Sequence, residues 1–411
     1  MSMNWNNRFA DRTSRMHASD IRELLKLTAR PEVISLAGGL PAPELFPIDE
    51  YRRAFEWVLE TNGRAALQYG PSEGYQPLRE LLATRMTAMG IPAEPEHILI
   101  TNGSQQGLDL VGKIFLNPDD AVCLENPSYM GAIQAFDSYQ AEYVIVPMDD
   151  EGMRSDELDG ILRRHQVKFI YALPNFQNPS GRTMSLERRK TLVATAQKHG
   201  VPIVEDDPYG ELRFEGEHLP SIRSLWPEGV IYLGTFSKIL APGFRLGWMV
   251  TPHDLYDEFV FGKQPADLHT SMATQMATFE VCNKDGFLAA HIEIIRDTYR
   301  RRRDAMLQAL DEHFPPECSW TRAQGGLFVW AELPRTIDTR ELLAEALEEN
   351  VAFVPGHSFH ADRSDQNTMR LNFSNVPEDR IREGIARLGR AIARRLARHE
   401  SEREQGAAVS P

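Results

Sequence analysis

The sequence is poor in cysteine, in long apolar runs and in basic charge. Its three cysteines, Cys123, Cys282 and Cys318, lie far apart among 411 residues, which excludes a disulfide framework or a cysteine-rich metal site and favours a reducing compartment. No apolar run reaches membrane-spanning length, and residues 1–15 carry no apolar segment of the kind found in secretory signals. These absences predict a cytoplasmic protein that does not bind membranes.

Acidic residues outnumber basic ones. The net charge is −14, whereas proteins that bind nucleic acid usually present a basic surface. The one dense basic run, Arg300 to Arg303, is expected to lie on the solvated face of a long helix. His357 and His360 lack the H-E-x-x-H spacing of a zinc site. We therefore expect no nucleic-acid partner and no metal.

What the chain does have is a regular alternation of apolar segments. Hydrophobic residues make up 42% of the sequence, which is enough for a large core. Short apolar runs predict strands at 97–101, 121–124, 142–146, 168–173, 201–205, 230–234 and 246–250. Helical periodicity lies between them, at 104–116, 128–137, 155–164 and 185–199. The alternation predicts an α/β fold with a mostly parallel, seven-stranded sheet between helices, and such sheets bind ligands at the carboxyl ends of their strands.

The same pattern divides the chain. Residues 46–300 are expected to form a large domain around the sheet. Residues 301–397 are expected to form a small α+β domain, entered through a long helix at 285–313. Residues 1–45 form an N-terminal arm counted with the small domain, and the polar residues 398–411 are expected to be a disordered tail. A cleft between two domains is a usual place for a binding site.

The segment 230–250 carries the most unusual chemistry. Two apolar runs enclose Ser237, Lys238 and Arg245, and an ammonium group is costly to bury without a partner. One interpretation places the lysine at a strand end with its amine in water. The other holds the amine in a pocket, where it forms a Schiff base with a carbonyl group while the hydroxyl and the guanidinium bind an anion.

A glycine-containing segment follows the first strand. Gly103, Ser104 and Gln105 open an apolar-periodic helix that Ser104 can cap, and the free amides and dipole of a helix N-terminus attract anions. An ordinary capped helix is the simpler interpretation of this motif alone. With Ser237 and Arg245 arriving from other strand ends, a phosphate site becomes the better one.

Three consecutive carboxylates, Glu205, Asp206 and Asp207, end another strand. Side chains alternate along a strand, so the three cannot all face one way. A pyridinium cofactor needs one carboxylate against its ring nitrogen, to hold the proton that makes the ring an electron sink. We assign this role to Asp206; a metal-binding or merely solvated acidic loop is the alternative.

Other strands are followed by side chains that can hydrogen-bond or stack. Asn178 precedes a proline and is held extended, so its amide can donate to a phenolate oxygen, and Tyr209 can donate a second hydrogen bond. Tyr129 can stack on an aromatic ring. Arg370, amid the apolar residues of a late strand, can bind an α-carboxylate through two hydrogen bonds. The alternatives are a turn, a packed tyrosine and an arginine at a sheet edge.

Taken in order, these motifs resemble those of the fold-type I enzymes that use pyridoxal 5′-phosphate (PLP), the aspartate aminotransferase superfamily. The resemblance covers about residues 8–397. Within class I/II it is closest to the 2-aminoadipate and kynurenine aminotransferase branch, because of the segments SDIRELLK at 19–26, AGGLPAPELFP at 37–47 and LQYGPSEGY at 67–75.

The resemblance implies a PLP-dependent aminotransferase in which Lys238 forms the Schiff base and Asp206 and Tyr209 assist. The amino group of an L-amino acid (2-aminoadipate, glutamate, leucine-like or aromatic) would pass to a 2-oxo acid, with 2-oxoglutarate as the expected acceptor, by a ping-pong mechanism. The cofactor would also contact Gly103, Ser104, Gln105, Tyr129, Asn178, Ser237 and Arg245.

Further site residues follow from the resemblance alone. The N-terminal segment would cover the substrate, with Arg22 meeting a distal acidic group. Gly39 would lie near the substrate carboxylate, which Arg370 and Asn178 would bind. Tyr69 would reach the cofactor phosphate of the neighbouring subunit, which implies a homodimer.

Three other functions stay open at this point. The same scaffold supports PLP-dependent lyases and decarboxylases, because the outcome depends on which substrate bond stands perpendicular to the ring. A non-catalytic sensor would bind PLP without exchanging amino groups, and a purely structural α/β protein would bind none. The related domain also occurs fused to DNA-binding modules in certain regulators, but no helix-turn-helix segment precedes it here, which counts against a regulator.

Overall fold

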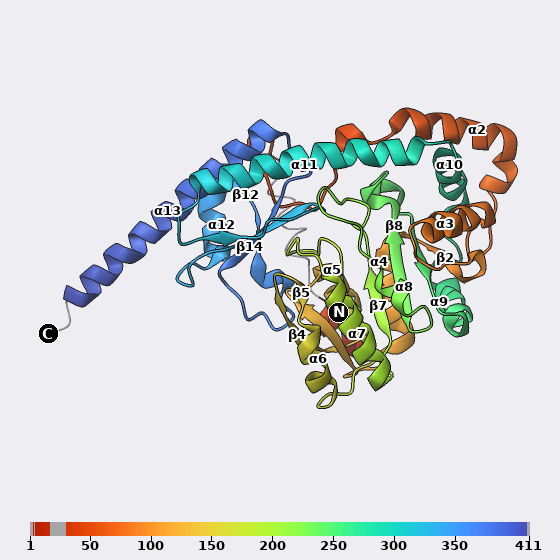
Figure 1. The fold of residues 1–411 in the computed structure, drawn as a ribbon, viewed down its shortest axis with the longest axis horizontal. Coiled ribbons are helices and arrows are strands. Elements are labelled where there is room, and N and C mark those ends of the chain that lie inside the picture. The colour runs from red at the N-terminus through yellow and green to blue at the C-terminus, as the bar shows by residue number, and fades with distance from the viewer. Residues whose placement is uncertain (1–2, 4, 17–29, 409–411) are drawn as a thin grey trace.

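The structure, a computed structural model, describes residue 3 and residues 5–16 and 30–408. Arg22 lies outside the described residues. The described chain forms a larger and a smaller unit, and one long helix, α11 (Phe287–His313), runs along both of them (Figure 1).

A sheet of eight strands forms the centre of the larger unit. In spatial order these are β2 (Ile98–Thr101), β9 (Gly247–Val250), β8 (Val230–Thr235), β7 (Ile203–Asp206), β6 (Phe169–Ala172), β3 (Ala121–Asn126), β4 (Glu142–Asp149) and β5 (Gly152–Met153). All seven predicted strands are present. Strand β9 runs antiparallel to β2 and β8, and the strands from β8 to β4 are parallel. The unpredicted strand, β5, adds only two residues antiparallel to β4, too few to give a periodic signal.

Helices cover both faces of this sheet. They are α2 (Ile48–Ala66), α3 (Gln76–Ala88), α4 (Gly103–Phe115), α5 (Met130–Asp137), α6 (Ser155–Leu162), α7 (Leu186–His199), α8 (Ile222–Leu225), α9 (Tyr256–Asp267) and α10 (Met272–Cys282). Alternate residues of β3 reveal the two layers. Val122 and Leu124 share a core with α4, α5 and α9, whereas Cys123 shares one with α6 and α7. Burial on both faces is why the strands are continuous apolar runs.

The smaller unit is built from two separate parts of the chain. Its main sheet is antiparallel, in the order β10 (Ser319–Trp320), β11 (Phe328–Glu332), β14 (Thr368–Asn372) and β13 (Val354–Pro355), with helices α12 (Thr339–Glu348) and α13 (Glu378–Ala408). Strand β1 (Ile34–Ser35) pairs in parallel with β12 (Val351–Ala352). The amide of Asn372 donates to the carbonyl of Leu36 at 2.8 Å, so the segment after β1 also lies against β14.

The basic run on α11 is not wholly solvated, which corrects the sequence-based expectation. Arg302 and Arg303 are 5% and 3% exposed, and they form ion pairs with Glu44 and Glu215. Helical periodicity turns half of a four-residue run inward, and the buried guanidinium groups are accepted because each has an acidic partner.

The C-terminal helix also differs from expectation. Helix α13 continues to Ala408, whereas the sequence predicts a disordered tail from residue 398. Residues 399–405 contain neither proline nor glycine and are rich in glutamate, so nothing in them stops a helix that is already formed.

Candidate active site

A cavity of about 500 Å³ lies where the carboxyl ends of the strands meet the smaller unit. Eleven predicted residues line it: Gly39, Ser104, Gln105, Tyr129, Asn178, Asp206, Tyr209, Ser237, Lys238, Arg245 and Arg370. Gly103 lies directly behind the lining, against Arg245. Tyr69 is not among the lining residues and is 77% exposed on the surface.

The turn after β8 sets the direction of Lys238. The hydroxyl of Thr235 accepts a hydrogen bond from the amide of Ser237 at 3.1 Å and donates to the Ser237 hydroxyl at 2.9 Å. These bonds cap a single 3-10 turn, η5 (Phe236–Lys238). The strand therefore ends abruptly, and the next side chain, that of Lys238, enters the cavity.

The amine of Lys238 lies in a cationic environment. Its Nζ donates to the carbonyl oxygen of Gly39 at 3.0 Å. Burial, together with the positive charges of Arg370 and Arg245, lowers the pKa of Lys238 to about 8. An amine with this pKa is partly unprotonated near neutral pH, so it can attack a carbonyl carbon.

The three carboxylates at the end of β7 separate as strand alternation requires. Glu205 accepts a hydrogen bond from the Ser221 hydroxyl at 2.6 Å, and Asp207 accepts one from the amide of Asn175 at 3.0 Å. Only Asp206 lines the cavity. Asp206 is also the carboxylate that was predicted from the sequence to contact the ring nitrogen, and this role stays a prediction.

Tyr171 of β6, which the sequence analysis missed, holds Asp206. Its hydroxyl donates to Oδ2 of Asp206 at 2.9 Å, while the buried Oδ1 has no hydrogen bond to any described residue. Burial raises the pKa of Asp206 to about 7; the Tyr171 bond acts in the opposite direction, and the charge of Asp207 adds to the rise. An unsatisfied buried acceptor is costly, so Oδ1 is suited to a ligand that brings an N–H donor.

Backbone and guanidinium approach closely at the start of α4. A β-carbon on Gly103 would lie 2.7 Å from Nη2 of Arg245, and one on Gly247 would lie 2.7 Å from the carbonyl carbon of Gly103. Arg245 itself has a left-handed backbone, with φ of 52°. The two glycines therefore let the helix N-terminus, Ser104 and the guanidinium converge where an anion can bind.

Ser104 does not cap α4, which corrects the sequence-based expectation. The helix begins at Gly103, so Asn102 has the N-cap position and Ser104 lies in the first turn. The backbone amide of Asn102 donates to Oε1 of Gln106 at 2.8 Å. The positive φ of Gly103, 71°, allows the chain to enter the helix earlier than a serine cap implies.

Aromatic and amide side chains surround the middle of the cavity. Tyr129 precedes α5, and its ring packs over Gly131, where an added β-carbon would lie 2.4 Å from the Cζ atom of Tyr129. Gln105 donates to the Gly131 carbonyl at 2.8 Å. Asn178 and Tyr209 are 4% exposed. These groups offer a stacking surface and donors for a flat, polar ring.

Arg370 reaches the cavity from β14 of the smaller unit. Its Cζ atom lies 4.2 Å from the ring centre of Phe328 and 4.9 Å from that of Phe359. Nη1 donates to Oδ1 of Asn178 and Nη2 to the carbonyl of Ala37, each at 2.8 Å.

No acidic side chain neutralises Arg370 within the described chain. The residue is 2% exposed, and its Nε has no hydrogen bond to a described residue. Burial lowers its pKa to about 10, so the guanidinium stays charged at neutral pH. A buried, unpaired cation favours an anionic ligand such as a carboxylate.

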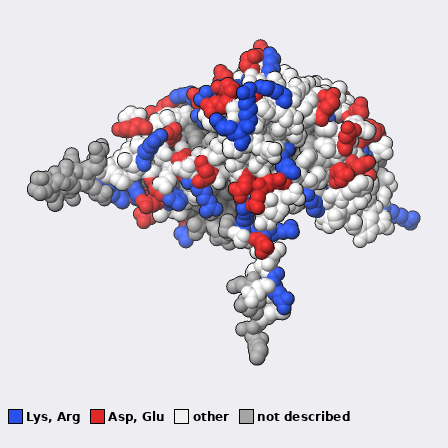
Figure 2. Space-filling model, turned by 90° about the horizontal axis from the view of Figure 1, so that it is seen from below, with Lys and Arg blue, Asp and Glu red and all other residues white. Residues whose placement is uncertain are grey.

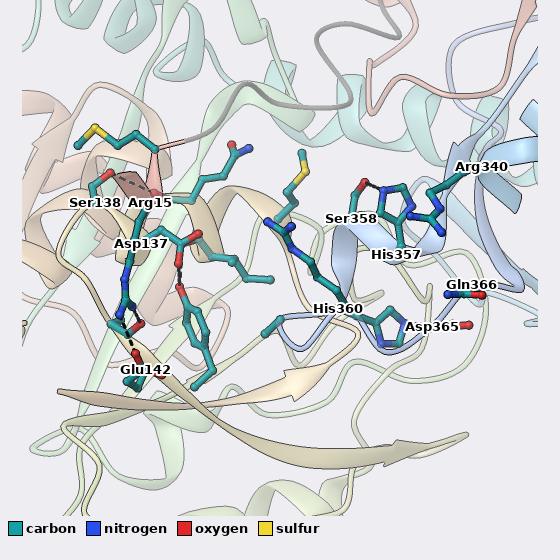
Figure 3. A pocket seen from close by; sticks show the side chains of 18 residues that line it. Arg15, Asp137, Ser138, Glu142, Arg340, His357, Ser358, His360, Asp365 and Gln366 are labelled. Atoms are coloured by element: carbon teal, nitrogen blue, oxygen red, sulfur yellow. Dashed lines mark hydrogen bonds and ion pairs between the residues drawn. The ribbon is translucent and has the colours of Figure 1, made fainter. Parts of the chain in front are cut away.

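A second cavity, of about 740 Å³, adjoins the first and shares Met130 and Gln134 with it. Arg15 and Glu142, which form an ion pair at 2.8 Å, line one side, and His357 and His360 of the smaller unit line the other (Figure 3). No sequence motif points to these residues, because they come together only where the two units meet.

The first cavity fits PLP in three chemical respects. The open Oδ1 of Asp206 can accept from a protonated ring nitrogen, Lys238 can hold an aldehyde carbon, and Arg245 with the start of α4 can bind a phosphate. Among the described residues, no group of three or more potential metal-ligating side chains occurs. No helix in the described chain is both long and apolar enough to cross a membrane.

Comparison with known proteins agrees with this geometry. The family model "Aminotransferase class I and II" matches residues 32–388. Aromatic-amino-acid aminotransferase 1 of Thermococcus litoralis is 47% identical, over 95% of both chains. The 2-aminoadipate transaminase of Thermus thermophilus is 47% identical, over 96% of this chain and 99% of the relative. The solved structure of LysN, the α-aminoadipate aminotransferase of Thermus thermophilus in complex with N-(5′-phosphopyridoxyl)-L-leucine, has a TM-score of 0.90 at 45% identity and covers 96% of this chain and 100% of LysN.

Proposed function

Because this chain belongs to the class I and II aminotransferases and is a PLP-dependent enzyme of the aromatic and 2-aminoadipate type, we propose that it moves the amino group of 2-aminoadipate, leucine-like or aromatic L-amino acids to 2-oxoglutarate. These donors are the ones that the similar proteins suggest, and glutamate, the product formed from 2-oxoglutarate, is the donor in the reverse direction. The observation that carries the proposal is the meeting of Lys238, Asp206 and Arg370 in one cavity.

PLP, when bound, supplies an electrophilic aldehyde carbon and a protonated ring that accepts electrons. Lys238 would hold the aldehyde carbon, and Asp206 would keep the ring nitrogen protonated. Asn178 and Tyr209 would donate to the phenolic oxygen, and Tyr129 would cover the ring face. The phosphate would be bound by Gly103, Ser104, Gln105, Ser237 and Arg245.

Arg370 and Lys238 divide the work on the substrate. Arg370, with Asn178 beside it and Gly39 close by, binds the α-carboxylate and fixes the orientation of the α-carbon. Lys238, once its amine is free, would act as the base that removes the α-proton and as the acid that gives it back; its pKa of about 8 suits both roles. The donor product leaves before the acceptor binds, so the kinetics are ping-pong. Arg22 lies outside the described residues. Its proposed role is to bind a distal acidic group of the substrate.

We further propose that the enzyme is a cytoplasmic homodimer in which Tyr69 serves the partner's site. Tyr69 is exposed together with its neighbours Leu67 and Leu268, which are 76% and 55% exposed. The edge of the Tyr69 ring contacts His269 at a centroid distance of 5.9 Å. Large apolar side chains that are exposed close together are typical of a subunit interface.

The test is a panel of L-amino acids with 2-oxoglutarate. We expect equimolar glutamate and new 2-oxo acid, parallel double-reciprocal lines, and at least about a thousandfold loss of turnover in Lys238→Ala. Stoichiometric ammonia would indicate a lyase and carbon dioxide a decarboxylase. A protein that binds PLP but exchanges no amino group would be a sensor, and a Lys238→Ala variant with near wild-type turnover would refute the mechanism.

A further inference from the structure

A buried ion pair lies behind the first turn of α4. Lys263 of α9 is 0% exposed, and its Nζ donates to both carboxylate oxygens of Asp267, at 2.6 and 2.8 Å. The same amine donates to Oε1 of Gln106 at 3.1 Å and to the Thr270 hydroxyl at 3.2 Å. Nothing in the proposed reaction uses this amine, although a lysine is rarely buried so completely.

Asp267 extends the network to the start of α4. It accepts from the side-chain amides of Asn102 at 2.5 Å and of Gln106 at 2.9 Å. Asn102 has the N-cap position, yet its side chain makes no capping bond to its own helix. Instead the amide is held by α9, while Gln106 binds the Asn102 backbone. The network therefore fixes the residue that precedes Gly103 and Ser104.

Asp267 places a negative charge beside the N-terminus of α4, and Lys263 neutralises that charge. A carboxylate beside a helix N-terminus satisfies the positive end of the dipole, and in doing so it competes with an incoming phosphate. The buried amine supplies one positive charge to that carboxylate within hydrogen-bonding distance. The pair can thus hold Asn102 and Gln106 in place without adding net negative charge behind the anion site.

We propose that Lys263 and Asp267 are positioning residues for the cofactor phosphate, holding the N-terminus of α4 while keeping the charge behind it neutral. This rests on the proposed function, which assigns that helix end to the phosphate. The residues act through Asn102 and Gln106 rather than on the reacting atoms.

The test compares PLP with pyridoxal, which lacks the phosphate. Apoprotein is titrated with each compound and binding is followed by cofactor absorbance. In Lys263→Met the carboxylate is left unneutralised, so affinity for PLP is expected to fall at least about tenfold while affinity for pyridoxal stays within about threefold. The double variant Lys263→Met with Asp267→Asn removes both charges and is expected to recover most of the loss.

Lys113→Met is the matched control. Lys113 also joins α4 to α9, through a 3.0 Å hydrogen bond to the Gly262 carbonyl, but it lies in the last turn of α4, away from the helix N-terminus. Its ratio of PLP to pyridoxal affinity is expected to equal that of the wild type. An equal loss for both compounds in Lys263→Met, or no loss, would overturn the proposal.

If the Lys263→Met variant does not fold, the Asp267→Asn variant tests the proposal instead. It keeps one side-chain oxygen that can accept from Asn102 and Gln106 and leaves a positive charge behind the phosphate, so its ratio of PLP to pyridoxal affinity is expected to exceed that of the wild type. A ratio equal to or below that of the wild type would overturn the electrostatic role. A wild-type protein that binds neither compound would instead refute the proposed function itself.

Discussion

Asp206 illustrates how burial ties one residue's ionisation to the state of the whole site. Its pKa is raised to about 7 by burial, against about 3.9 in an unfolded chain. The folded apoprotein therefore favours the protonated acid. The stability that this contributes is present at low pH and is lost as the pH rises through about 7.

We expect Asp206→Asn to flatten that pH dependence in the apoprotein. Between pH 5 and pH 8 the wild type should lose about 1 to 3 kcal/mol more of its free energy of unfolding than the variant. Urea unfolding of both apoproteins at the two pH values measures the difference, and other titrating groups cancel in the comparison. Parallel pH profiles would contradict the assignment. With PLP present, the wild type should instead lose less of its free energy of unfolding than the variant, since the variant cannot hold the ring proton.

Arg370→Lys tests whether the planar guanidinium is needed. A lysine supplies the charge but neither the paired donors nor the stacking between Phe328 and Phe359. We expect kcat/KM for amino acids to fall about a hundredfold, with PLP affinity within about threefold of the wild type. Arg322→Lys, at a surface ion pair with Asp311, serves as the control and should change neither. A loss of PLP affinity equal to the loss in kcat/KM would argue for a structural role.

At this scale the sequence predicted charged groups that line the cavity and missed the groups that hold them. Lys238, Asp206 and Arg370 stand out in the sequence because each is a charged residue within or at the end of an apolar run. Tyr171 does not, since a tyrosine in a buried strand is ordinary. Its contact with Asp206 depends on the register that pairs Tyr171 with Val204, and register is not written in either strand alone.

At the scale of elements, the close packing of β9 against α4 depends on the absence of a side chain at Gly247. A β-carbon at Gly247 would come within 2.8 Å of both the Gly234 carbonyl oxygen and the Ser104 amide nitrogen. We expect Gly247→Ala to weaken PLP binding about tenfold or more and to lower the thermal midpoint, because the backbone of α4 must shift. Gly243→Ala, four residues earlier, has nothing within 4 Å of its new methyl group and should leave both measurements unchanged. Equal effects of the two variants would contradict the packing argument.

The presence of the main strands and helices could be predicted from the sequence, whereas the exact helix starts and the short strands could not. Continuous apolar runs predicted all seven main strands, because a sheet buried on both faces imposes that pattern. The start of α4 moved by one residue, because Gly103 adopts a positive φ that no local propensity dictates. The pairing of Lys263 with Asp267 follows helical spacing, but only tertiary packing shows that this pair is buried while similar pairs are solvated. Solvated pairs at helical spacing include Arg52 with Asp49 and Lys190 with Glu187. Figure 2 shows acidic and basic side chains interspersed over one face of the molecule.

At the scale of the whole molecule, exchange of subunits can reveal where Tyr69 acts. Lys238→Ala and Tyr69→Phe subunits are unfolded together and refolded as a mixture. The proposed dimer gives each hybrid one site with both an intact lysine and an intact tyrosine, so an equal mixture should regain about one quarter of wild-type activity at limiting PLP. The Lys238→Ala parent alone should be inactive. The Tyr69→Phe parent alone should bind PLP about tenfold more weakly than the wild type. A mixture no more active than its parents would place Tyr69 in its own subunit or outside the site.

The smaller unit is built from two separate parts of the chain, and this limits how its wall of the cavity can be exchanged between related enzymes. The guanidinium that is proposed to bind the substrate carboxylate comes from β14, yet one of its two hydrogen bonds ends on Ala37, more than 300 residues earlier. A chimaera joined at a single point within α11 would import the arginine and leave its support behind. Transplanting that wall of the cavity requires two crossover points, one on each side of the scaffold that stays.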